Sequence, residues 1–255
     1  SKNRNQIFIG PDFCPKPVNR THVTYAGIFR IAATELSVTK QSRLTFQINW
    51  EPRIRPLYLT IDGKSISATD DQQNKIKCHL FGERTLNVEG RASSVKIEIP
   101  LELPQQEATK LTSVKGTLSA VLPGRHEPFS FSLTPKTPAT PAKQQRAGVI
   151  VELQQAVAIT ERIEVQVKIT YADAGDAFAS HRGWLSHNAT YLSIDGQRVL
   201  GTPSRKTLQQ TAQSVTYLFG FDCTAPLSEL KFHYHTPALL LHKQIEFEIH
   251  DIPLP

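Results

Sequence analysis

The sequence lacks methionine, has few cysteines and contains no long hydrophobic run. Because methionine is absent altogether, Ser1 is predicted to be a processed or trimmed end, from which a signal peptide, an anchor or a larger parent could have been removed. An odd number of cysteines excludes a fully paired framework; Cys14 and Cys78 could form one bridge, or both could be free like Cys223. No stretch approaches the roughly 18 apolar residues of a membrane span, so we expect none in this chain.

Motifs that mark catalytic or nucleotide-binding sites are also missing. The chain has no G-x-S-x-G, H-E-x-x-H, G-x-G-x-x-G or P-loop pattern. The net charge is +6, from 29 basic and 23 acidic residues, but the basic residues are scattered along the chain. Nucleic-acid-binding proteins usually concentrate such charge on one face. We therefore expect a protein that is not an enzyme, that needs no cofactor and that has no nucleic-acid partner.

Alternation of apolar and polar residues is the strongest pattern that the chain does contain. Such alternation places every second side chain on one face and is typical of a half-buried β-strand. No window of similar length has the spacing of a long amphipathic helix. An all-β fold is therefore predicted, with strands over 44–50, 95–103, 163–171, 215–221 and 245–249.

One proline-rich segment divides the chain. Residues 134–145 read TPKTPATPAKQQ, without any aromatic or branched aliphatic residue and with a proline at every third position of its first part. Such a composition favours an extended, semi-rigid linker over a central strand. The sequence thus predicts a first domain over 1–133, a linker over 134–146 and a second domain over 147–255.

The two halves of the chain resemble each other. YLTIDGK at 58–64 matches YLSIDGQ at 191–197, and both run into Asp-Gly, a strong hairpin-turn signal. The offset between these two segments is 133. Residues 43–48 parallel 162–167 at an offset of 119, and 114–115 with 129–133 parallel 230–231 with 245–249 at an offset of 116. Short strands in two copies predict two tandem immunoglobulin-like or fibronectin-III-like β-sandwich domains.

The repeated YLxIDG strand, SHRGW at 180–184 and the final FEIHDIPLP resemble uncharacterised tandem β-sandwich, immunoglobulin-like proteins of planctomycete-type bacteria. The resemblance covers the second half of the chain well and the first half loosely. It implies the fold and an extracytoplasmic location, periplasmic or at the cell surface, but no activity and no site.

A loop insertion distinguishes the two halves. The offset between them grows from 119 to 133, so about fourteen extra residues fall within 173–188. Duplicated scaffolds usually keep their strands and specialise their loops. This loop is therefore either a ligand-recognition loop, or a structural plug in which the tryptophan closes the end of the sandwich. Its candidate ligand-binding residues are His181, Arg182, Trp184, His187 and Asn188.

Two histidines could instead bind a metal. His233 and His235 lie on one face of a predicted strand, where an i, i+2 pair can ligate a transition metal. A third ligand would have to come from His181, His187 or Asp176 in the inserted loop. The alternative is an ordinary solvated face of a sheet, which is the more frequent origin of such a pattern.

Three hypotheses on function follow from these patterns. The first is a non-catalytic binding or scaffold module of an exported or cell-envelope bacterial protein, with a protein or envelope component as partner. The second is a carbohydrate-binding module that uses Trp184 and Tyr191, with Trp50 as a further aromatic. The third is a metal-dependent enzyme that uses the histidines of the second half.

Overall fold

A computed structural model of the chain describes residues 22–38, 42–89, 92–103, 108–134, 141–172, 185, 188–199 and 202–254. The described residues form mostly β-strands, as the alternation predicted, and the helical turns that lie wholly within them, η3 (Gly63–Ser65) and η5 (Leu227–Glu229), are of the 3-10 type. All strand pairs are antiparallel and belong to a 12-stranded and a 5-stranded sheet. Within the described ranges no helix is long and apolar enough to cross a membrane.

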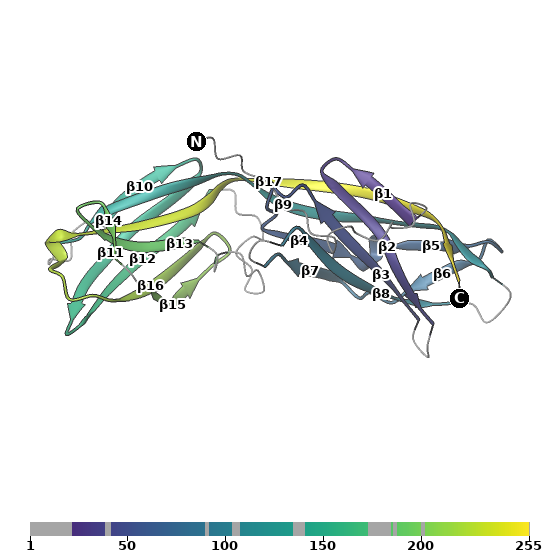
Figure 1. Cartoon of the computed structure of the whole chain (residues 1–255), viewed down its shortest axis with the longest axis horizontal. Coiled ribbons are helices and arrows are strands. Elements are labelled where there is room, and N and C mark those ends of the chain that lie inside the picture. The colour runs from purple at the N-terminus through teal and green to yellow at the C-terminus, as the bar shows by residue number, and fades with distance from the viewer. Residues whose placement is uncertain are drawn as a thin grey trace, which may run out of the picture.

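The strands build two lobes, here called the first and the second sandwich (Figure 1). The first sandwich contains β1 (Val23–Ala26), β2 (Phe29–Ser37), β3 (Ser42–Trp50), β4 (Tyr58–Asp62), β5 (Ser67–Asp70), β6 (Lys75–Cys78), β7 (Glu83–Asn87) and β8 (Ser94–Glu102). The second contains β10 (Ala142–Arg146), β11 (Val149–Ile159), β12 (Arg162–Tyr171), β13 (Ala189–Ile194), β14 (Gln197–Arg198), β15 (Ser204–Gln210) and β16 (Ser214–Asp222). Two long strands, β9 (Lys110–Ser132) and β17 (Leu230–Pro253), belong to both.

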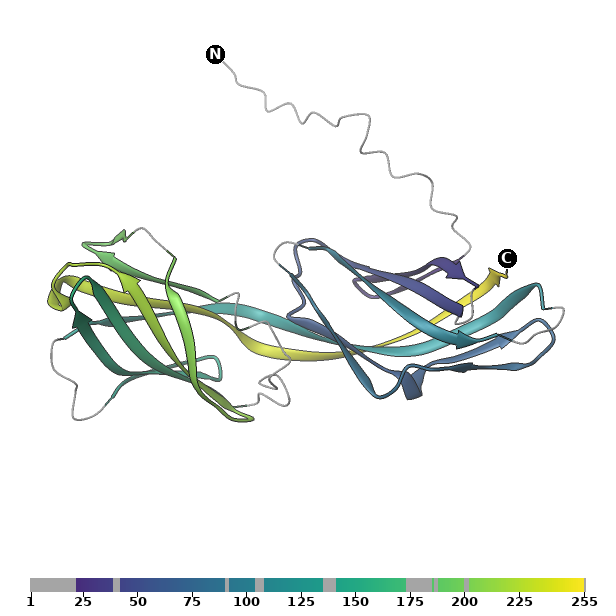
Figure 2. The same ribbon diagram turned by 90° about the horizontal axis from the view of Figure 1, so that it is seen from below.

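The long strands form a ribbon that runs through both sandwiches (Figure 2). β9 and β17 have 23 and 24 residues and pair antiparallel from Lys231 opposite Ser132 to Pro253 opposite Lys110. The pairing keeps one register along its whole length. At the waist between the lobes, a Cβ on Gly124 would lie 2.9 Å from the Cβ of Leu239, so glycine permits the close approach of the two strands there.

The two hydrophobic cores lie on opposite faces of this ribbon. On β17, Phe232 and Tyr234 are buried in the core of the second sandwich, whereas Phe247 and Ile249 are buried in the core of the first. Even-numbered and odd-numbered side chains of one strand point to opposite faces of the sheet. From Val114 onward β9 follows the same rule, because its even-numbered Val114 and Leu118 join the first core and its odd-numbered Phe129 and Phe131 join the second.

This ribbon corrects the predicted domain boundaries. Ile245, Phe247 and Ile249 were assigned to the second domain, but they pack with the first core. Conversely, Phe131 and Leu133 were assigned to the first domain and pack with the second core. The apolar alternation changes phase in the middle of each long strand, so each strand contributes its two halves to different sandwiches.

The predicted linker is also wrong in its second part. Residues 142–146 form β10, which pairs with β11 through a tight turn in which Ala147 and Gly148 have positive φ. The connection from β9 to β10 starts and ends in the second sandwich, so it does not join the two lobes; the ribbon does. The lysine and glutamines of AKQQR can form a strand because β10 is an edge strand with exposed side chains. Residues 135–140 lie outside the described residues.

The repeated Asp-Gly pair makes two different turns. Asp195 and Gly196 have φ of 49° and 81° and form the predicted two-residue hairpin between β13 and β14. Asp62 instead caps η3, where its Oδ1 accepts a hydrogen bond from the Lys64 amide at 3.0 Å. At Gly63 a Cβ would lie 1.6 Å from the carbonyl oxygen of Leu80, so glycine is needed there for space and not for a positive φ.

Candidate functional site

The second sandwich has two seams, where the edges of its two sheets face each other. One seam lies between β9 and β10 and is closed by the side chain of Gln144 on β10. Its Nε2 donates to the carbonyl oxygen of Ser130 at 2.5 Å, and its Oε1 accepts from the Ser130 amide at 3.4 Å. The side-chain amide of Gln144 thus pairs with both the N–H and the C=O of Ser130 at the edge of β9, as the backbone of a neighbouring strand would.

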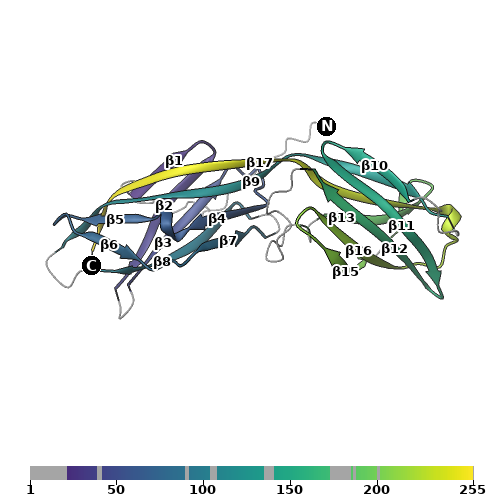
Figure 3. The same ribbon diagram turned by 180° about the vertical axis from the view of Figure 1, so that it is seen from behind.

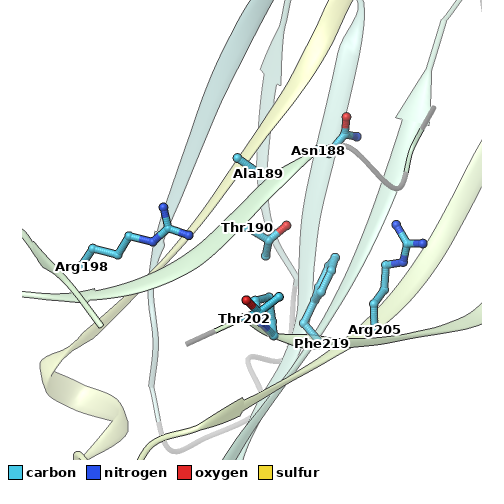
Figure 4. A pocket seen from close by; sticks show the side chains of 8 residues that line it. Asn188, Ala189, Thr190, Arg198, Thr202, Arg205 and Phe219 are labelled. Carbon is cyan, nitrogen blue, oxygen red and sulfur yellow. The ribbon is translucent and has the colours of Figure 1, made fainter. Parts of the chain in front are cut away.

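The other seam, between β13 and β15, is open. A groove of about 410 Å³ occupies it, with Phe219 and Pro203 as apolar lining and the hydroxyl-bearing Thr190 and Thr202 beside them. Arg198 of β14 and Arg205 of β15 flank these residues from opposite sides (Figure 4). Asn188 and Ala189, at the start of β13, complete the lining.

The two arginines are held in place without a carboxylate partner. The guanidinium carbon of Arg198 lies 4.7 Å from the centroid of the Tyr191 ring. That of Arg205 lies 5.1 Å from the Tyr217 ring, and its Nη1 donates to the carbonyl oxygen of Leu185 at 3.1 Å. In the described part of the chain, neither guanidinium has an Asp or Glu oxygen within 4 Å, and no acidic residue lines the groove. The lining that these residues form is therefore positively charged.

Buried hydrogen bonds anchor one end of the groove. The Nδ2 of Asn188 donates to the hydroxyl of Tyr234 at 2.7 Å and to Oγ1 of Thr236 at 2.8 Å. The hydroxyl of Tyr171 lies 2.6 Å from the same Oγ1 and donates to the carbonyl oxygen of Pro237 at 2.8 Å. Burial raises the pKa of both tyrosines, so both stay protonated. The two hydrogen bonds from Nδ2 of Asn188 therefore fix the start of β13 against β17.

Most of the predicted recognition loop lies outside the described residues. This applies to His181, Arg182, Trp184 and His187, so whether they contact a ligand stays a prediction. Leu185 is described and is buried in the second core, at 6% exposure. The loop therefore contributes at least one apolar side chain to the packing beside the groove.

The histidine pair lies on the outer face of the second sandwich. Nε2 of His233 is 2.8 Å from Oγ of Ser193, and the His233 ring stacks on Tyr191 with centroids 4.6 Å apart. Burial, together with the nearby His235 and Lys231, lowers the pKa of His233 and favours its neutral form. No group of three or more His, Cys, Asp or Glu among the described residues could hold a metal ion. A metal site would thus depend on His181, His187 or Asp176, which are not described.

The aromatic residues of the carbohydrate hypothesis are already engaged. Trp50 is 4% exposed and belongs to the first core. Tyr191 has His233 on the β17 side and Arg198 on the β14 side of its ring. A sugar would therefore have to stack on Trp184, which lies outside the described residues. Of the cysteines, Cys78 and Cys223 are free thiols, and Cys14 is not described.

Sequence reasoning did not find Arg198 and Arg205. They are seven positions apart, belong to different sheets and match no motif. The available signal was the composition of 204–210, SRKTLQQ, which has two basic and no acidic residues and only one large apolar side chain. That is an unusual strand, and its side chains are exposed throughout.

Comparison with known proteins gives little further information. No family model and no curated protein matches the chain. Among solved structures it is similar to one described as "the conserved domain protein from Bacillus anthracis", at 6% identity over 90% of this chain and 89% of that chain. The TM-score is 0.28, and a similarity of this size carries no argument about fold or function.

Proposed function

We propose that the protein is a non-catalytic binding module of an exported or cell-envelope bacterial protein, and that the seam groove of the second sandwich holds an anionic group of its partner. The observation that carries this proposal is the pair Arg198 and Arg205, which flank a groove of about 410 Å³ without a carboxylate neighbour among the described residues. The extracytoplasmic location rests on the resemblance of the sequence motifs alone.

The chemistry of the lining suits an anion. A guanidinium presents a planar fork of donors that matches carboxylate, sulfate or phosphate oxygens, and charge-assisted hydrogen bonds are the strongest of their kind. The hydroxyls of Thr190 and Thr202 supply further donors, and Phe219 supplies an apolar surface for the stem of the bound group. Because both arginines already rest on aromatic rings, little side-chain entropy is lost on binding.

A binding assay with anionic polymers tests the proposal. Immobilised protein is probed with poly-L-glutamate, polygalacturonate and heparin at moderate salt. We expect at least one polymer to bind, and the Arg198→Ala/Arg205→Ala variant to bind it at least tenfold more weakly, because charged hydrogen bonds contribute about 1.5–3 kcal/mol each. The Arg53→Ala/Arg84→Ala variant, which removes the same charge from exposed positions of the first sandwich, should bind like the unmodified protein. Equal weakening in both variants would indicate non-specific charge attraction and contradict the proposal.

We further propose that the two sandwiches are duplicated immunoglobulin-like units. The offset of 116 relates 114–115 to 230–231 and 129–133 to 245–249. With the observed register, the centre of this relation falls between Pro123 and Gly124, opposite Leu239 and Leu240. This is the waist of the molecule, as expected if two equivalent strands were paired about a pseudo-two-fold axis.

A further inference from the structure

The open seam is bordered by Ser204–Thr207 of β15 and by the start of β13, and neither segment has a strand neighbour on the groove side among the described residues. β15 ends the 5-stranded sheet and pairs only with β16. On β13, the carbonyl oxygen of Leu192 accepts from the Val199 amide, on the side away from β17. Because N–H and C=O of alternate residues point to the same side of an antiparallel strand, those of Thr190 also point away from β17, toward the groove that Thr190 lines. Exposed edges of this kind are templates for a further strand.

Two other seams of the molecule show what completes such edges. In the second sandwich, the amide of Gln144 occupies both polar groups of Ser130. In the first sandwich, β6 pairs with β5 on one side and with β8 on the other, so a strand joins the two sheets (Figure 3). A side-chain amide closes one of these seams, and the backbone amides of a strand close the other. Among the described residues, no side-chain amide and no further strand bridges the seam between β13 and β15.

Charge indicates which chain could complete the open seam. β15 carries Arg205 and Lys206 and no acid, and Arg198 faces it across the groove. Residues 1–21 of this chain contain four basic residues and one acidic residue, so a second copy would present a segment of the same sign. An acidic segment of another protein has the complementary charge.

We infer that the partner of the proposed binding module is an extended acidic peptide segment, which adds as a strand to the β15 edge and places a carboxylate between Arg198 and Arg205. This inference rests on the proposed function and specifies its ligand. The ladder of β15 shifts register between Thr207 and Gln209, so the regular edge is limited to Ser204–Thr207. A bulge of this kind interrupts pairing, and the recognised motif is correspondingly short. Main-chain hydrogen bonds supply affinity in such complexes, and side-chain pockets supply specificity.

Synthetic peptides test the inference. The probes are TVEVEVT, its lysine counterpart TVKVKVT, and TVEVEVT with alternate backbone amides methylated, which keeps both charges but blocks strand pairing. We expect TVEVEVT to bind, TVKVKVT not to bind, and the methylated peptide to bind at least tenfold more weakly. The Arg198→Ala/Arg205→Ala variant should also weaken TVEVEVT at least tenfold, with Arg53→Ala/Arg84→Ala as the matched control. Amide hydrogen exchange of residues 204–207 should slow when TVEVEVT is bound.

The possible results separate the inference from the proposed function. If the methylated peptide binds as well as TVEVEVT, or if exchange at 204–207 does not slow, strand addition is wrong. If polygalacturonate or heparin binds in an arginine-dependent manner and the peptides do not, the partner class is wrong and the proposed function stands. If no anionic probe binds, both the inference and the proposed function are wrong. Because Arg205 packs on Tyr217, the single variant Arg198→Gln, on the exposed β14, repeats the test without disturbing that contact.

Discussion

The two sandwiches share a ribbon but finish their edges differently. In the first sandwich β6 connects the two sheets by pairing with both β5 and β8. In the second, β15 lies at the end of its sheet and pairs with β16 alone among the described strands, and a groove lies beside it. At this seam the first sandwich is therefore closed by a strand, whereas the second has two arginines beside a groove. This difference is the reason why we propose a binding function for the second sandwich and not for the first.

Mirrored core substitutions should give the largest effect and test how the ribbon divides the cores. Phe247→Ala should destabilise the first sandwich and Phe131→Ala the second, each by about 3–5 kcal/mol, because both rings are almost fully buried. Hydrogen exchange would show the first variant accelerating β3 and β8, and the second accelerating β12 and β16. If Phe247→Ala instead accelerated exchange in β12 and β16, residues 147–255 would form a domain of their own.

The two Asp-Gly turns should respond differently to alanine. Gly63→Ala should cost about 3 kcal/mol or more, because its Cβ would overlap the Leu80 carbonyl oxygen and the backbone would have to move. Gly196→Ala should cost about 1–2 kcal/mol, from positive φ alone, since no atom lies within 4 Å of its Cβ. Asparagine, which tolerates positive φ, should rescue position 196 and not position 63. Urea unfolding of the four variants measures these differences, and equal costs would contradict the two explanations.

The closed seam should be weakened by loss of one side chain. Gln144→Ala should cost about 1 kcal/mol, the usual net contribution of hydrogen bonds, and should speed amide exchange at Ser130. Gln145→Ala, at the neighbouring exposed position, serves as the control and should change neither quantity. If both variants behave alike, Gln144 does not close the seam.

The smallest expected effect is a difference in acid sensitivity between the lobes. Burial, reinforced by nearby cationic groups, lowers the pKa of His126 and His233 of the second sandwich. A histidine whose folded pKa is lowered destabilises the fold as the pH falls below about 6.5, its unfolded value. In the first sandwich, hydrogen bonds lower the pKa of carboxylates such as Asp71 and Glu248. Their contribution to the free energy of unfolding is therefore kept until the pH falls below about 4.

Unfolding followed by exchange at pH 7, 5.5 and 3.5 measures this difference. Between pH 7 and 5.5 only the second sandwich should lose stability, and the His126→Gln/His233→Gln variant should abolish that loss. Below pH 4 the first sandwich should follow. A uniform loss in both lobes over the upper range would show that these histidines do not control it.

Strand positions were predictable because alternation is a local property. β3 buries Leu44, Phe46, Ile48 and Trp50 as the pattern indicated, and 163–171 lies within β12. The ribbon was not predictable in the same way, since the change of phase within β9 and β17 looks in sequence like the end of one strand and the start of another. One long strand and two separate strands can be distinguished only by which core each half of β9 or β17 faces. That depends on contacts between residues distant in sequence.

The candidate site was less accessible to sequence reasoning than the fold. Asn188 was predicted as a ligand contact and does line the groove, but the internal hydrogen bonds from its Nδ2 to Tyr234 and Thr236 had no signal in the sequence. Arg198 and Arg205 become neighbours of one groove only because the two sheets face each other there. A positive groove is a property of two edges together, and neither edge carries a motif.

The ribbon also determines how the molecule would carry a mechanical load. His22, the first described residue, lies within hydrogen-bonding distance of the His250 carbonyl oxygen, and Leu254 follows four residues later. A force applied between these two points acts on β1 and on the Pro253 end of the ribbon, and both belong to the first sandwich. The second sandwich does not lie between these two points, so its groove would stay unstrained as long as the ribbon remained paired at the waist.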